Sequence, residues 1–185
     1  MSHSVSEWLT CRGVRKKTAW LIVVPFLVFS RPVPVLLWIG AFLTLLGLVL
    51  RGWSAGTISK AETLTTTGPY AYTRNPLYLG SFLIGVGLSI AGANFIWLAL
   101  FLIYFIATHT VAISRERAEL KELFDQSYLE YQDQVPVFLP RLTPHRTHSP
   151  DDDSRFEWPR YLRNREWEAL LGATTALAVL YLKLI

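Results

Sequence analysis

Five blocks of apolar residues divide this chain, and they constrain its fold more than any other feature. Each block is 13 to 18 residues long, and short polar or proline-containing segments separate them. An upright membrane span needs about 20 apolar residues, so length alone leaves a bundle of buried helices in a soluble protein open as an alternative. The blocks cover residues 18–30, 34–50, 77–91, 95–112 and 169–185.

Composition and aromatic placement favour the membrane interpretation. Charged residues make up 17% of the chain and apolar residues 51%, whereas soluble domains carry roughly 25% charged residues. Tryptophans flank the blocks, as interfacial aromatics flank membrane helices. They are Trp20, Trp38, Trp53, Trp97 and Trp167. We therefore expect an all-α integral membrane helical bundle of about five transmembrane helices.

The basic residues predict one topology. With a cytoplasmic N-terminus and five spanning blocks, sixteen of the 18 Lys and Arg residues face the cytoplasm, and only Arg31 and Lys183 do not. Cytoplasmic loops show this bias. The bias explains the net charge of +4, so we expect no nucleic-acid partner. A lone cysteine, Cys11, excludes an intrachain disulfide.

The whole chain, residues 1–185, is expected to form one membrane domain. Residues 114–132 carry apolar side chains at three- and four-residue steps, which predicts a cytoplasmic amphipathic helix. Three prolines in the following VPVFLPRLTP end that helix. The expected parts are a first helical hairpin (18–50), a core (51–140), a cytoplasmic loop (141–168) and a last transmembrane helix (169–185).

The stretch TTTGPYAYTRNPLYLG, residues 65–80, is unusually polar for its position before an apolar helix. Asn75 and Pro76 have the form of an N-cap followed by the first helical residue. The N-terminus of that helix would attract a carboxylate or phosphate, and Tyr70 supplies a ring that can stack on a flat group. Residues of these kinds also occur at the ends of ordinary membrane helices, so simple packing remains the alternative.

Glu116 lies at the edge of the apolar stripe of the amphipathic helix, where an unpaired carboxylate is costly. It either pairs with a neighbouring cation such as Arg115, Arg117 or Lys121, or it binds a cationic or amine-bearing ligand. His109 lies two turns earlier on the same side, as a packing residue or a functional one. No group of residues has metal-ligand spacing, and we expect no metal.

Residues 51–140 resemble the isoprenylcysteine carboxyl methyltransferase and phospholipid methyltransferase families of integral-membrane enzymes. The similarity rests on two blocks in order. The first is Gly68-Pro69-Tyr70 with Arg74-Asn75-Pro76-Leu77-Tyr78-Leu79-Gly80, and the second holds Glu116, Leu120, Phe124, Tyr128, Tyr131, Val135-Pro136 and Leu139-Pro140. The resemblance implies an S-adenosylmethionine-dependent methyltransferase, isoprenylcysteine carboxyl methyltransferase-like, that acts on a lipid-like or prenylated acceptor.

By this resemblance the catalytic residues are Glu116, Arg74 and His109. Glu116 would hold the amino group of the methionine part. At the position where isoprenylcysteine enzymes place a substrate-facing arginine, this chain has Ala112, so Arg115 and Arg117 become the candidate substrate residues. The implied cofactor contacts are Glu62, Thr63, Leu64, Thr65, Tyr70, Asn75, Pro76, Leu77, Tyr78, Gly80 and Glu116.

Three other functions remain open at this stage. A phospholipid amine N-methyltransferase is the nearest, an NADPH-dependent sterol-reductase-like enzyme is the second, and a non-enzymatic membrane scaffold is the third. The chain is expected in a bacterial inner membrane or an endoplasmic reticulum membrane, with its N-terminus and active site in the cytoplasm. Its partners would be the bilayer and a lipid-like substrate.

Overall fold

The computed structural model describes residues 23–58, 63–145 and 155–185. All regular structure in this part of the chain is helical, which confirms the predicted all-α class. The first block begins before the described residues, and its remaining residues 23–29 are helical. The later elements are α3 (Pro34–Thr57), the 3-10 helix η1 (Gly68–Ala71), α4 (Pro76–Ala91), α5 (Phe95–Gln134), α6 (Trp158–Arg163) and α7 (Trp167–Leu182).

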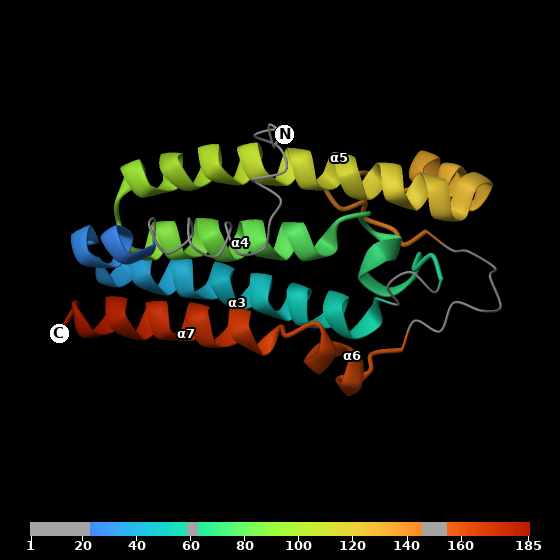
Figure 1. Ribbon diagram of the computed structural model, residues 1–185. Coiled ribbons are helices and arrows are strands. Elements are labelled where there is room, and N and C mark those ends of the chain that lie inside the picture. Colours follow the sequence, from blue (N-terminus) through green and yellow to red (C-terminus); the bar gives the residue numbers. More distant parts are fainter. Residues whose placement is uncertain (1–22, 59–62, 146–154) are drawn as a thin grey trace, which may run out of the picture.

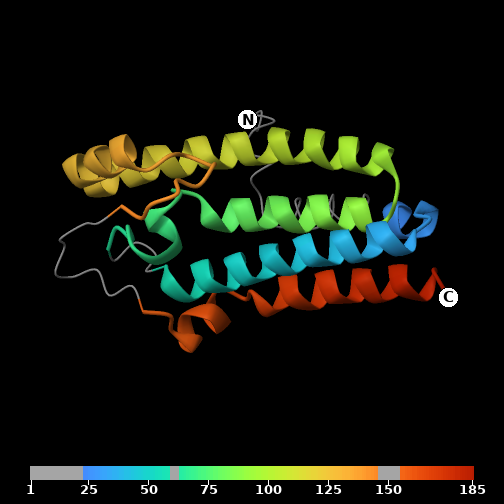
Figure 2. The same cartoon turned by 180° about the vertical axis from the view of Figure 1, so that it is seen from behind.

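The four long helices run side by side (Figures 1 and 2), with α4 packed against α3 and α5, and α7 packed against both α3 and α4. The turn from α4 to α5 and the C-terminus lie at one end of the bundle. The 3-10 helix η1, the short α6 and the end of α5 lie at the opposite end, which we call the loop end. Both candidate motif blocks are therefore at the loop end.

Two described helices, α3 and α5, are long and apolar enough to cross a membrane. Only 22% of the apolar window in α3 and 11% of that in α5 is buried, which argues against the buried core of a soluble protein. The apolar helices α4 and α7 are shorter, at 16 residues each. The count of five spans stays a prediction.

Small residues bring α3 and α4 into close contact. A Cβ atom on Gly40 would lie 2.3 Å from the carbonyl oxygen of Gly87, and one on Gly47 would lie 2.6 Å from that of Gly80. Glycines at both positions let the two backbones approach, as in other membrane helix pairs. This packing fixes the position of Arg51, one turn after Gly47, beside the beginning of α4.

The predicted amphipathic helix is not separate from the fourth apolar block, because nothing in the sequence between residues 112 and 114 breaks a helix. The two form one helix, α5, of 40 residues, with a kink at Asp125. The helix ends at Gln134, immediately before Val135-Pro136, because a proline disfavours helical backbone in the residue that precedes it. The predicted end is confirmed.

At the end of the bundle opposite the loops, Lys183 ties α7 to the first helix. Its Nζ donates hydrogen bonds to the carbonyl oxygens of Leu27, Val28 and Ser30 at 2.8, 2.9 and 2.6 Å. These carbonyls belong to the last turn of the helix and have no partner further along it. The ammonium group therefore closes this helix terminus and fixes α7 beside it.

Candidate functional site

At the loop end, the first motif block meets the end of the second block and the residues that follow it. Backbone N–H groups of Arg74 and Arg141 donate to the carbonyls of Pro136 and Tyr72 at 2.9 and 3.0 Å. The Thr73 hydroxyl donates to the carbonyl of Phe138 at 3.0 Å. These bonds hold the segment before α4 against the segment after α5, so residues of both blocks surround one site.

Asn75 precedes α4 and Pro76 is its first residue, as predicted. The expected side-chain cap is wrong, because the Asn75 side chain makes no hydrogen bond to the helix. Its Nδ2 instead donates to the carbonyl of Val137 at 2.8 Å. Asn75 thus joins the two blocks, and the first N–H groups of α4 lack a side-chain acceptor from this residue.

Tyr70 is a buried polar residue of the site. It is 6% exposed, and its hydroxyl has no hydrogen-bond partner. Its carbonyl accepts a 2.8 Å hydrogen bond from the Tyr131 hydroxyl, which fixes the backbone. Burial raises the pKa of the Tyr70 hydroxyl well above its ordinary value, and the negative charges of Glu116 and Glu166 raise it further. Tyr70 therefore lies within electrostatic reach of both carboxylates.

A second polar atom in this region also lacks a partner. The Nε of Arg74 is buried without a hydrogen bond. Buried polar groups in folded proteins are almost always satisfied, so these two atoms, together with Gln132 Oε1, which also lacks a partner, are candidate contacts for a polar ligand.

Tyr78 and His109 connect α4 to α5 beside this site. Their rings make an edge-to-face contact with centroids 5.1 Å apart. The His109 ring also stacks on Phe105 at 3.9 Å, and its Nδ1 lies 3.1 Å from the Phe105 carbonyl oxygen. His109 is thus held in a defined orientation, and the predicted functional roles of Tyr78 and His109 stay predictions.

The structure places the other predicted cofactor residues unevenly. Thr65 is buried, Leu64 packs on the apolar cluster at the end of α5, and Thr63 is exposed. Gly80 faces α3, where an added Cβ would lie 2.8 Å from the carbonyl oxygen of Gly47. Gly80 therefore packs helices, which was the alternative left open for such residues. Glu62 lies outside the described residues.

A cavity of about 840 Å³ lies between α4, α5 and α7. Pockets of roughly 300–1,000 Å³ hold small-molecule ligands. Its walls are polar toward the loop end and apolar toward the opposite end. The polar side chains include Arg51, Ser81, His109, Asn164 and Glu166, and the apolar ones include Phe26, Leu88, Trp97, Phe101, Ala173 and Ala176.

An ion pair that the sequence did not predict lies at the polar end of this cavity. Arg51 Nε and Nη2 donate to the two carboxylate oxygens of Glu166 at 2.8 and 2.7 Å. The side chain of Glu166 is 8% exposed and that of Arg51 is 22% exposed. The sequence did contain one indication of this pair, because Arg51 is the only charged residue of α3. A charged residue inside an apolar helix normally has a function and a partner.

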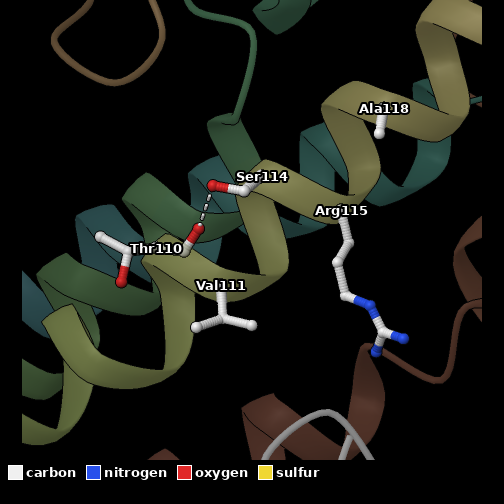
Figure 3. Close-up of a pocket in the computed structure, with 5 residues that line it drawn as sticks. All are labelled: Thr110, Val111, Ser114, Arg115 and Ala118. Carbon is white, nitrogen blue, oxygen red and sulfur yellow. Dashed lines mark hydrogen bonds between the residues drawn. The ribbon is translucent and has the colours of Figure 1, made fainter. Parts of the chain in front are cut away.

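The predicted substrate residues Arg115 and Arg117 are exposed and do not line this cavity. Arg115 instead borders a shallow hollow of about 440 Å³ on α5, together with Thr110, Val111, Ser114 and Ala118. In Figure 3 the Ser114 hydroxyl bonds to the Thr110 carbonyl one turn earlier, and the Arg115 side chain extends away from the helix. A role for these two arginines in substrate binding stays a prediction.

Comparison with known proteins agrees with the resemblance. A family model described as "Phospholipid methyltransferase" matches residues 35–127. The cobalt-zinc-cadmium resistance protein CzcN of Cupriavidus metallidurans is 32% identical over 162 residues, which cover 80% of this chain and 73% of that protein. The described residues contain no group of three or more His, Cys, Asp or Glu able to hold a metal ion.

Two further relatives match over a smaller share of their lengths. The protein-S-isoprenylcysteine O-methyltransferase of Schizosaccharomyces pombe is 31% identical over 67% of this chain and 55% of that enzyme. The nickel-cobalt-cadmium resistance protein NccN of Alcaligenes xylosoxydans xylosoxydans is 33% identical over 60% of this chain and 56% of that protein. No solved structure gives a significant match. With its family match across half the chain and both motif blocks assembled at the loop end, this chain belongs to the phospholipid methyltransferase family.

Proposed function

We propose that this protein is an integral-membrane methyltransferase that uses S-adenosylmethionine to methylate an amphiphilic, lipid-like acceptor. The observation that carries the proposal is the position of the unsatisfied Tyr70 hydroxyl. This hydroxyl is buried, and the charges of Glu116 and Glu166 both raise its pKa, while Glu166 also lines the cavity between the helices. A cofactor site at the loops and an acceptor site within the bundle would thus be neighbours.

The cofactor would be held by the chain's own polar groups at the loop end. Glu116 would accept from its amino group, and the unsatisfied donors of Tyr70 and Arg74 would bind its carboxylate. The N-terminus of α4, after Asn75, adds a positive dipole end. When bound, the sulfonium of S-adenosylmethionine supplies an electrophilic methyl group, and the role left to the protein is to orient donor and acceptor in a dry pocket.

The acceptor would enter from the bilayer, because the cavity is apolar along most of its length and polar at the end nearest the cofactor residues. A carboxylate or thiolate acceptor needs no base. An amine acceptor must first lose a proton, and His109 lines the cavity. With its Nδ1–H donating to the Phe105 carbonyl, His109 would take that proton on Nε2.

Methylation of a phospholipid amine is the second candidate function. The name of the matching family model favours it, and a carboxylate in the cavity wall, Glu166, could accept from an ammonium group. The isoprenylcysteine relative favours carboxyl methylation instead. Both candidates share the cofactor site and the lateral cavity, so one binding experiment tests what they have in common.

That experiment is calorimetric titration of S-adenosylhomocysteine into the purified protein in detergent. We expect micromolar binding that is lost in Glu116→Ala and in Tyr78→Ala. Glu119→Ala is the matched control, since Glu119 is an exposed carboxylate one turn along α5, and it should bind as the wild type does. Binding of NADPH in place of S-adenosylhomocysteine would move the assignment to a reductase, and binding of neither would favour the scaffold.

A further inference from the structure

The most unusual feature of the cavity is the largely buried charged pair at its polar end. Burying two charges costs several kcal/mol for each ion, and replacing such a pair with apolar residues is often neutral or stabilising. The pair of Arg51 and Glu166 is therefore poorly explained by stability alone. Both residues line the cavity, which suggests that they contact what enters it.

The hydrogen bonds of Arg51 show which member of the pair has capacity for a ligand. A guanidinium group has five N–H donors. Nε and one N–H of Nη2 bind Glu166, and the two N–H groups of Nη1 bind the Ser81 hydroxyl and the Leu77 carbonyl oxygen. One N–H of Nη2 remains, so the ion pair orients the guanidinium and leaves it one donor.

The other cations near the cavity are placed differently. Arg165 also borders the cavity, but its side chain is 63% exposed and pairs with Glu168, so it lies at the rim. The predicted substrate residues Arg115 and Arg117 do not line the cavity. Arg51 is therefore the cation in the cavity wall, and the methyl-accepting end of an acceptor would lie between it and the cofactor residues.

We propose that Arg51 is the specificity-determining residue of the acceptor site and that it binds an acidic head group, a carboxylate or a phosphate, carried on an apolar chain. Glu166 is a positioning residue that holds the guanidinium in the cavity wall. This assignment rests on the proposed function for its link to methyl transfer, whereas the binding of an acidic amphiphile follows from the cavity alone. Hydrogen bonds from a guanidinium to an anion are among the strong ones in proteins.

Paired probes that share an apolar chain, one with an acidic group and one without, test the assignment. The protein is reconstituted in phosphatidylcholine nanodiscs, and binding is followed by quenching of tryptophan fluorescence, since Trp97 lines the cavity. The carboxylate pair is N-acetyl-S-farnesylcysteine and its carboxamide, and the phosphate pair is hexadecyl phosphate and hexadecanol. We expect the wild type to bind at least one acidic probe about tenfold or more tightly than its neutral partner. Which pair discriminates identifies the acid.

Variants separate recognition from folding. Arg51→Met alone would leave Glu166 buried without its partner, so the decisive variant is Arg51→Met with Glu166→Met, which removes both charges. It should keep S-adenosylhomocysteine affinity and lose the preference for the acid. Arg160→Met is the control, because Arg160 pairs with Glu157 outside the cavity, and it should keep the preference.

Equal binding of both members of each probe pair by the wild type would overturn the assignment, and so would a preference that survives in the double variant. The two proposals fail separately. Binding of S-adenosylhomocysteine without discrimination between probes would remove only the role of Arg51. Discrimination without S-adenosylhomocysteine binding would leave an acid-binding cavity and remove the methyltransferase.

Discussion

The close packing of α3 and α4 makes a quantitative prediction about two glycines. Gly87 faces α3, and a Cβ atom on it would lie 2.5 Å from Thr44 Oγ1, 2.6 Å from the Gly40 carbonyl oxygen and 2.7 Å from the Thr44 backbone nitrogen. Gly172, in α7, has nothing within 4 Å of the same position. We expect Gly87→Ala to destabilise the protein and Gly172→Ala to stabilise it.

The magnitude follows from two opposing effects. Alanine is favoured over glycine within a helix by about 1 kcal/mol, and both sites receive this gain. At Gly87 two of the three contacts are backbone atoms, so α3 and α4 must separate, and overpacking of this kind costs about 1–3 kcal/mol. The free energies of unfolding of the two variants should therefore differ by about 1–3 kcal/mol, with Gly172→Ala the more stable.

The assay is titration with sodium dodecyl sulfate in mixed micelles, followed by tryptophan fluorescence. Comparing the two variants with each other cancels the helix-propensity gain, which isolates the packing cost. If Gly87→Ala were as stable as Gly172→Ala, the two helices would not be in the close contact described here, and the position of Arg51 beside α4 would lose its basis.

Three more predictions concern the ends of the bundle. Lys183→Met removes the hydrogen bonds to three terminal carbonyls and should lower the free energy of unfolding by about 1–3 kcal/mol in the same titration, while exposed Lys121→Met leaves it unchanged. Tyr131→Phe removes the 2.8 Å bond to the Tyr70 carbonyl and should weaken S-adenosylhomocysteine binding, and unchanged calorimetric affinity would contradict this. The free energy of unfolding should fall as pH rises above about 10. In the unfolded protein the Tyr70 hydroxyl then loses its proton, whereas in the folded protein its raised pKa keeps it protonated. Tyr70→Phe should reduce that slope.

Local chemistry in the sequence determined much of this architecture. Pro76 begins α4 because its ring sets a helical φ and its missing N–H is not needed in the first turn. The helix α5 ends at Gln134 because Pro136 disfavours helical backbone in the residue before it. The apolar blocks and the three- and four-residue spacing of the stripe on residues 114–132 were sufficient to predict helices, whereas the assignment of Tyr70, Tyr78 and Glu116 to one cofactor site stays a prediction.

Only the tertiary structure decided the partners of individual polar side chains. Asn75 was predicted to cap its own helix, and it instead binds a carbonyl 62 residues away. Arg51 and Glu166 are separated by 115 residues, and their contact depends on how far α3 and α7 slide along each other. No local pattern specifies that alignment, because it depends on contacts between helices that are far apart in the sequence.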